Sequence, residues 1–159
     1  MQDHAKSAHH EGGSRPYAML AVNLGLSLVV MYVAMFAMIW TWGEFIQNVN
    51  FFYMALVMWA PMGAIMLATM GGMYRNRKLN TALYMGFAAV FVLSLLGIRQ
   101  QSLVGDDQFL RSMIPHHSGA ILMCEEAKLT DPEIRGLCGE IIEAQKQEIA
   151  QMKRIMDRL

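Results

Sequence analysis

Charged residues and cysteines are both scarce in this sequence. Of its 159 residues, 16% are charged and 55% are apolar, and the formal net charge is zero. So few charges cannot cover an ordinary soluble domain of this size, and a large part of the chain must therefore face lipid. No basic block and no stripe of lysine and arginine interleaved with aromatic residues is present, which gives no support to nucleic-acid binding.

Three long apolar runs follow a polar N-terminal segment. We interpret residues 1–16 as a flexible tail that contains histidine and lacks the pattern of a signal peptide. The runs at 17–42, 51–73 and 81–98 are each close to the roughly 20 residues that a helix needs to cross the hydrocarbon core. The sequence therefore predicts a transmembrane region of three helices over residues 17–98.

The loops between these runs predict an orientation. The loop after the second run carries Arg75, Arg77 and Lys78, whereas the loop before it carries only Glu44. Because basic loops stay in the cytoplasm, we expect a cytoplasmic N-terminus and a C-terminal part in the periplasm or outside the cell. The expected location is the inner membrane of a bacterium.

Methionine is unusually abundant, with sixteen copies. Those of the second run recur at every fourth position: Met54, Met58, Met62, Met66 and Met70. A ladder of thioethers could pass Cu(I) through a membrane, but no charged residue or histidine interrupts the runs, as a transport pathway usually requires. We therefore interpret the ladder as packing.

After the third run the sequence changes to two amphipathic helices. Asp106 or Asp107 is the expected N-cap of the first, and Asp131, followed by proline and glutamate, is a strong start signal for the second. The short connection between them makes the two helices antiparallel neighbours. We expect a soluble two-helix domain over residues 106–159 and, since nothing reads as a strand, an all-α chain.

One face of the first amphipathic helix carries thioether and imidazole side chains. Together these ligands suit Cu(I), because soft ligands select soft ions, and burying two adjacent histidines without partners would be costly. The predicted metal ligands, from this face and from the facing helix, are His116, His117, Met113, Met123 and Met152. Gln145 and Glu148 are expected to orient the imidazoles; for Glu148, a surface pair with Arg111 is the alternative.

The two cysteines, Cys124 and Cys138, are too few for a disulfide framework and do not form a Cys-x-x-Cys pair. A disulfide between them would suit an oxidising compartment. However, helix axes usually lie about 8–10 Å apart, from which we expect Cα atoms too distant for a disulfide. Free, buried thiols are the preferred expectation, with Cys124 as an auxiliary ligand.

Two motifs of this C-terminal part carry a resemblance: DxFxxxMIPHHxxAIxM, which begins at Asp107, and IIxAQxxEIxxM, which begins at Ile141. Over residues 106–159 the chain resembles the family called domain of unknown function 305, and the part with three apolar runs looks like membrane-anchored members. The resemblance implies a ferritin-like helical hairpin or bundle, often exported and associated with copper binding and copper tolerance. It implies binding rather than catalysis.

These features predict a membrane-anchored copper-binding protein, not an enzyme, which presents its site on the periplasmic side for copper sequestration, tolerance or hand-over. Its expected partners are the copper ion and the lipid bilayer. Because a single hairpin is only part of a bundle, a second copy of the chain or a partner in a membrane complex is a further candidate. The alternative function is a structural or assembly subunit of a larger membrane complex, without metal.

Overall fold

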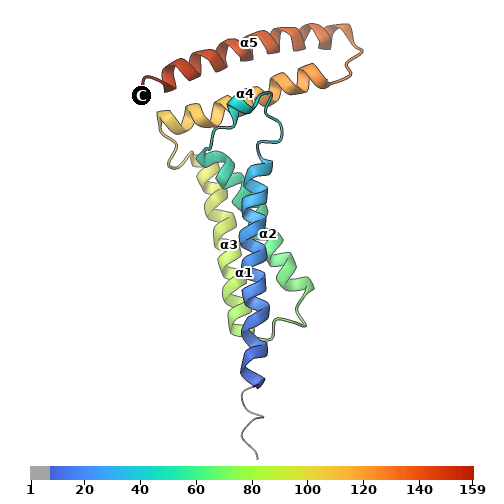
Figure 1. Cartoon of the computed structure of the whole chain (residues 1–159), viewed down its shortest axis with the longest axis vertical. Coiled ribbons are helices and arrows are strands. Elements are labelled where there is room, and N and C mark those ends of the chain that lie inside the picture. Colours follow the sequence, from blue (N-terminus) through green and yellow to red (C-terminus); the bar gives the residue numbers. More distant parts are fainter. Residues whose placement is uncertain (1–7) are drawn as a thin grey trace, which may run out of the picture. The chain divides into compact units, whose positions relative to one another are not determined.

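The structure is a computed structural model that describes residues 8–159, with side chains from Arg15 onward (Figure 1). Its elements are α1 (Ala8–Ala34), the short 3-10 helix η1 (Trp42–Glu44), α2 (Val49–Thr69), α3 (Arg77–Gln100), α4 (Asp106–Glu126) and α5 (Pro132–Met156). No strand occurs among the described residues, so the prediction of an all-α chain is confirmed for them.

The chain folds into two compact units. The first, which we call the three-helix unit, comprises the residues up to Tyr32 and Tyr53–Gln100. The second, which we call the hairpin unit, comprises Val33–Phe52 and Gln101–Leu159. The hairpin unit is thus built from two stretches of sequence, and we call its first stretch, residues 33–52, the connecting segment.

The helices of the three-helix unit expose apolar side chains. Arg15–Ala34, Val49–Thr69 and Arg77–Gln100 are long and apolar enough to cross a membrane. Val30 of α1 is 66% exposed and Met85 of α3 is 68% exposed. An apolar outer surface on helices of this length is what lipid contact requires, because the helix satisfies its own backbone and leaves only apolar side chains outside.

Small residues let the helices of this unit approach closely. Gly63 of α2 is buried, and a Cβ atom built there would lie 2.6 Å from the ring of Phe87 on α3. The indole Nε1 of Trp59 donates a 2.7 Å hydrogen bond to the carbonyl of Leu24 on α1. The core formed by these contacts comprises Leu20, Leu24, Ala60, Leu67, Tyr74 and Phe87.

The methionine ladder of α2 divides between this core and the outside. Met62 and Met66 pack against the core. In contrast, Met54, Met58 and Met70 are 44%, 43% and 42% exposed. The ladder is therefore not one continuous buried path within this unit, which favours the packing interpretation.

The first apolar run differs from its predicted span, 17–42. The helix ends at Ala34, and the remaining apolar residues form turns within the connecting segment. There Phe36 is 4% exposed, and its ring lies 4.2 Å from that of Phe45 and 4.9 Å from that of Phe51. The predicted span was too long because the apolar residues after Ala34 pack inside the hairpin unit and do not continue the helix.

The predicted tail, residues 1–16, also differs in part, because α1 begins at Ala8. The residues before Ala8, including His4, lie outside the described residues. The side chains of His9 and His10 are likewise outside the description.

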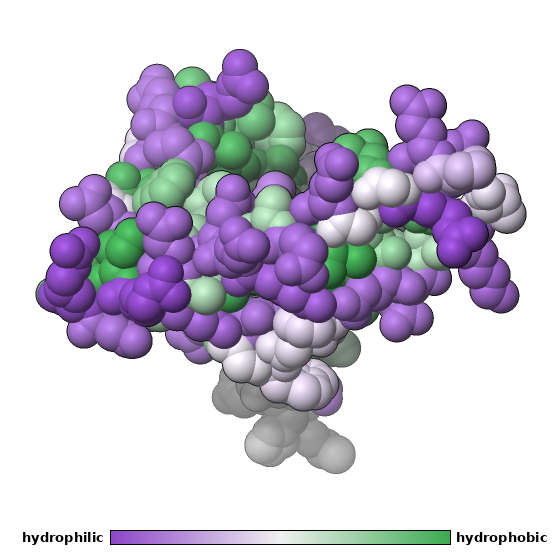
Figure 2. All heavy atoms as spheres, turned by 90° about the horizontal axis from the view of Figure 1, so that it is seen from above, coloured by the Kyte–Doolittle hydropathy of each residue, from purple (hydrophilic) through white to green (hydrophobic). Residues whose placement is uncertain are grey.

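The helices α4 and α5 form the predicted antiparallel hairpin (Figure 1). Their shared core comprises Leu110, Ile114 and Ile121 from α4 with Ile149 and Met152 from α5. Polar side chains cover most of the face shown in Figure 2, with apolar patches among them. Within this unit, exposed apolar side chains include Phe109 at 50%, Ile134 at 48% and Leu137 at 55%.

The two helix starts of the hairpin differ in how well the sequence predicts them. The Asp131 carboxylate accepts hydrogen bonds from the backbone amides of the second and third residues of α5, at 2.9 and 3.1 Å, which confirms it as the N-cap. The N-cap of α4 is Gly105, not Asp106 or Asp107. The two aspartates occupy the next two positions, in the first turn, where a carboxylate still gains from the helix dipole.

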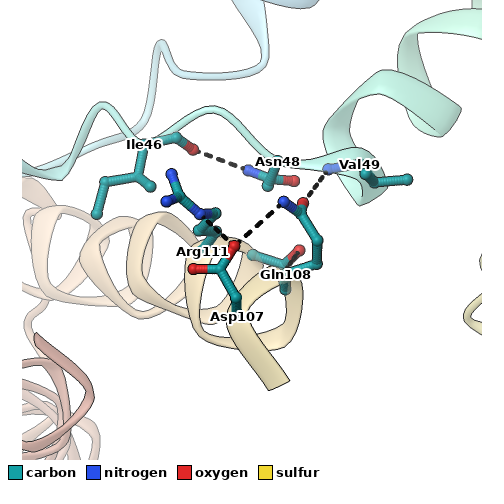
Figure 3. Close-up of polar contacts among 7 residues, drawn as sticks. Ile46, Asn48, Val49, Asp107, Gln108 and Arg111 are labelled. Carbon is teal, nitrogen blue, oxygen red and sulfur yellow. Dashed lines mark hydrogen bonds and ion pairs between the residues drawn. The ribbon is translucent and has the colours of Figure 1, made fainter. Parts of the chain in front are cut away.

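Side-chain amides fasten the connecting segment to the start of α4 (Figure 3). Gln108 Oε1 accepts a 3.1 Å hydrogen bond from the backbone amide of Val49, the first residue of α2. Asn48 Oδ1 accepts from the amide of Phe51 at 2.8 Å. Because the first amides of a helix have no partner within it, these contacts both cap α2 and fix residues 48–51 against α4.

Candidate metal centre

His117 lies in the hairpin unit with both ring nitrogens engaged. Its Nδ1 lies 2.9 Å from the backbone carbonyl oxygen of Met113, one turn earlier on α4. Its Nε2 lies 2.8 Å from Oε2 of Glu148 on α5, and the side chain is only 12% exposed. The imidazole is thus held in one orientation between two helices.

The two partners define which atom of His117 can bind a metal. A carbonyl oxygen only accepts hydrogen bonds, so Nδ1 carries a hydrogen and donates it to Met113. The carboxylate of Glu148 also accepts, so Nε2 faces it either with a second proton or with a cation in the proton's place. A backbone carbonyl that fixes Nδ1–H and leaves Nε2 for the metal is the usual support of a metal-bound histidine.

Glu148 has a neighbour that orients it in turn. Gln145 Nε2 lies 3.5 Å from Glu148 Oε2. The same oxygen contacts His117, so the Glu148 carboxylate lies between an amide and an imidazole. The contact of Glu148 with an imidazole is the one that the sequence led us to expect. The alternative pairing with Arg111 is absent, because Arg111 Nε binds Asp107 Oδ2 at 2.7 Å, within α4.

Two of the predicted thioether ligands belong to the hairpin core, in the same unit as His117 and Glu148. Met152 is 9% exposed and belongs to the hairpin core, and Met113 packs against the same core. Met113 precedes His117 by four residues, which places the two on the same side of α4. Both methionines therefore belong to the core that α4 and α5 share.

His116 lies on the outside of the hairpin. Its side chain is exposed, and its ring centroid is 6.0 Å from that of His117, with the ring planes at 65°. The adjacent histidines thus point in different directions, as residues 100° apart on a helix must. His116 can meet an ion that reaches His117 from solvent, but it does not share the buried position.

Met123 is separated from the other predicted ligands. It is 53% exposed and lies ten residues after Met113, a rise of about 15 Å along an α-helix. Two sulfurs bound to one ion lie within roughly 4.6 Å of each other, because a metal–sulfur bond is about 2.3 Å long. The five predicted ligands therefore cannot surround one ion, and Met123 belongs to another level of the hairpin.

Acidic and imidazole ligands alone do not form a site in the described part of the chain, because no group of three or more His, Cys, Asp or Glu side chains there is placed to hold a metal ion. His117, Glu148 and the two core methionines remain the candidate ligands.

The expectation of free thiols is wrong. Cys124 and Cys138 form a disulfide that joins α4 to α5, with a Cα–Cα distance of 5.3 Å. The error lies in using the distance between helix axes: subtracting two backbone radii of about 2.3 Å from an axial separation of 8–10 Å leaves roughly 3–5 Å between facing Cα atoms. Facing residues of a packed hairpin are therefore within disulfide range.

The sequence did not predict a buried ionic cluster in the same unit. Glu44, treated above only as a loop charge, is 3% exposed. Its carboxylate accepts a hydrogen bond from the hydroxyl of Ser118, which is 0% exposed, and Oε1 lies 3.5 Å from Nζ of Lys153. A lone acid within an apolar stretch was the available signal, because burying a carboxylate without partners is costly.

Trp40 extends these contacts along the connecting segment. Its backbone amide donates to the Ser118 hydroxyl, and its indole Nε1 donates to Glu125 Oε2 at 2.6 Å. Lys146 Nζ lies 4.5 Å from the centroid of the indole ring and 3.2 Å from Glu125 Oε1. The connecting segment is thus attached to both helices of the hairpin, along the side that carries Ser118 and Glu125.

Fold and residues together define an all-helical protein with one apolar three-helix unit and one polar hairpin unit that orients a histidine. Residues 61–156 match the family described as Domain of unknown function (DUF305), and the chain belongs to that family. The match begins within α2 and takes in α3, α4 and all of α5. It thus extends well beyond the stretch that carries the two motifs.

A viral protein is also similar to this chain. Protein L153 of Acanthamoeba polyphaga mimivirus is 32% identical to it over 120 residues, which cover 72% of this chain and 75% of the viral protein. No solved structure matches the chain.

Proposed function

We propose that this chain is a membrane-anchored copper-binding protein whose site is built around His117. The observation that carries the proposal is the orientation of that ring, with Nδ1–H on the Met113 carbonyl and Nε2 against Glu148. Imidazole nitrogen, carboxylate oxygen and thioether sulfur are all copper ligands, and the thioethers of Met113 and Met152 favour Cu(I). The Met113 carbonyl orients the ring, Glu148 lies beside Nε2 as a second ligand, Gln145 contacts Glu148, and His116 offers an outer ligand.

Several features support a position in a membrane with the hairpin unit outside the cytoplasm. The three apolar helices have the length for spanning, and the basic residues between α2 and α3 favour the cytoplasm. The connecting segment and residues 101–159 belong to one unit. If α2 and α3 each cross the membrane once, the chain returns to the same side, which agrees with this grouping. A disulfide suits an oxidising compartment such as a bacterial periplasm, so the bacterial inner membrane is the proposed location.

The proposed role is sequestration, tolerance or hand-over of copper, not catalysis. A ferritin-like arrangement, in which a second copy of the hairpin or another membrane protein completes the bundle, belongs to the same proposal. The exposed position of His116 suits entry and transfer, because an ion can bind an outer ligand before and after the inner one.

The test is a Cu(I) titration of the full chain in detergent, against a chromophoric Cu(I) chelator, with the disulfide intact. His117→Ala should abolish stoichiometric binding. Glu148→Gln should weaken it, because the neutral amide replaces the carboxylate that lies beside Nε2. Glu143→Gln, which removes an exposed carboxylate from the same helix, is the matched control and should change nothing.

Further variants define the ligands and the metal. Met113→Leu should weaken Cu(I) more than Zn(II), because thioether prefers the softer ion, whereas His117→Ala should weaken both. Undiminished copper binding in the double variant His116→Ala and His117→Ala would reject the proposal.

The alternative is a metal-free assembly subunit, in which His117 and Glu148 form an ion pair that helps to hold the hairpin together. Exposed apolar side chains on both helices, among them Phe109 and Leu137, favour this reading because they could pack against a partner. Protein that purifies without metal, binds no copper and keeps a fixed partner would support it.

A further inference from the structure

The Cys124–Cys138 disulfide occupies a position where two soft ligands face each other across the hairpin. We propose that it is the oxidised form of a second copper site, in which the two thiols bind one Cu(I) ion after reduction. This inference goes beyond the proposed function, because its ligands are thiols and it requires neither His117 nor Glu148.

The hairpin core holds the two cysteines in place without the disulfide. Ile121, one turn before Cys124 on α4, is 0% exposed and belongs to the core. Ile142, one turn after Cys138 on α5, packs against that core. With the Cα atoms only 5.3 Å apart, the released sulfurs stay within the roughly 4.6 Å that one metal ion bridges.

This position is separate from the His117 centre. Cys124 follows His117 by seven residues, a rise of about 10 Å along the helix, so no single ion reaches both. Both cysteines are partly exposed. Met123, which the His117 centre cannot use, adjoins Cys124 with 53% of its surface exposed and offers a third soft donor.

The chemistry balances with a dithiol as the reductant. The dithiol gives two electrons and two protons to the disulfide and is itself oxidised to a disulfide, leaving Cys124 and Cys138 as thiols. Cu(I) then forms two copper–sulfur bonds and displaces the two thiol protons, and its oxidation state does not change. Exchange with an oxidised dithiol reverses the sequence: its disulfide takes two electrons from the copper-bound thiolates and two protons from solvent, and Cys124 and Cys138 rejoin as the Cu(I) ion leaves. The copper capacity of the hairpin thus depends on its redox state.

The experiment compares the full chain in detergent before and after reduction. A phosphine reduces the disulfide, is removed without oxygen, and the thiols are counted. Cu(I) is then titrated against a chromophoric chelator. We expect the reduced chain to bind one more copper ion than the oxidised chain. The double variant Cys124→Ser and Cys138→Ser should show no such gain.

Two further measurements keep the outcome unambiguous. The variant His116→Ala with His117→Ala should retain the gain on reduction, so failure of the His117 centre and failure of the thiol site are distinguishable. Circular dichroism of the reduced chain should retain the helical signal of the oxidised one. Equal copper uptake by reduced wild type and by the double serine variant would overturn the proposal, as would loss of the helical signal on reduction.

Discussion

The three-helix unit and the hairpin unit are both helical and both have an apolar core, but they differ in the side chains that surround that core. In the three-helix unit the most exposed side chains include Val30 and Met85, and close contact depends on small residues such as Gly63. In the hairpin unit the apolar residues converge on Ile114 and Ile121, both 0% exposed, and ionic and amide contacts surround them. The three helices that expose these apolar side chains are long and apolar enough to cross a membrane, whereas α4 and α5 are not among such helices.

The largest expected effect is an all-or-none difference in labelling that tests the sidedness of this comparison. Gly72→Cys and Gly105→Cys both place a thiol where a Cβ atom meets nothing within 4 Å. An impermeant thiol reagent added outside intact cells should label the second and spare the first. The native cysteines give little background, because they are joined in a disulfide. Labelling in the opposite pattern would reverse the proposed orientation.

A core substitution sharpens the contrast in burial. Ile114→Ala should lower the free energy of unfolding of the hairpin unit by about 2–5 kcal/mol, because it removes fully buried methyl groups and leaves a cavity. Val30→Ala in α1 is the control, since its side chain is already 66% exposed, and it should cost little. Thermal melts followed by circular dichroism in detergent compare the two. Equal losses of stability in the two variants would mean that Val30 is buried against another molecule.

A third change tests whether the connecting segment belongs energetically to the hairpin unit. Ser118→Ala removes a buried hydroxyl that donates to the Glu44 carboxylate, and it should cost about 1.5–3 kcal/mol, the range for hydrogen bonds to charged groups. Thr130→Ala, an exposed hydroxyl in the same unit, should be nearly neutral. Limited proteolysis within residues 35–44 should accelerate only in the first variant. Unchanged protection would separate the segment from the hairpin.

The smallest expected effect concerns close contact in the three-helix unit. Gly63→Ala places a methyl group 2.6 Å from the Phe87 ring, and such overpacking costs about 1–3 kcal/mol. Gly86→Ala in α3 meets nothing within 4 Å, so it should be neutral or slightly stabilising. Melting temperatures of the two variants measure the difference. A tolerant Gly63 position would show that the helices can separate without cost.

The same contrast explains which parts of the fold the sequence could predict. The second and third apolar runs predict α2 and α3 to within a few residues, because polar residues bound them on both sides. The end of the first helix was predicted wrongly. Phe36 is as apolar as a lipid-facing residue, but it is buried beside Phe45 and Phe51. Composition records how apolar a residue is, but not which surface it covers.

The candidate centre was predictable where it depends on helical periodicity. The pattern placed His117 and Glu148 on facing sides of the hairpin, and the structure joins them. The same helical rise separates Met113 from Met123, so the sequence already indicates that these two thioethers lie at different levels of α4. The contact between Glu44 and Ser118 spans 74 residues, and no local pattern carries such information.

That long separation has a consequence for how the chain is made. Glu44 leaves the ribosome 109 residues before Lys153 (153 − 44 = 109), and at 5–20 residues per second this delay lasts roughly 5–20 s. During the first part of that interval α2 and α3 are synthesised; the Ser118 partner follows 74 residues after Glu44, and the Lys153 partner comes last. The hairpin unit therefore cannot close as an autonomous C-terminal appendage after residue 105. Its assembly must wait until the two helices that interrupt it have been synthesised, so the two stretches of the unit can pair only late in the synthesis of the chain.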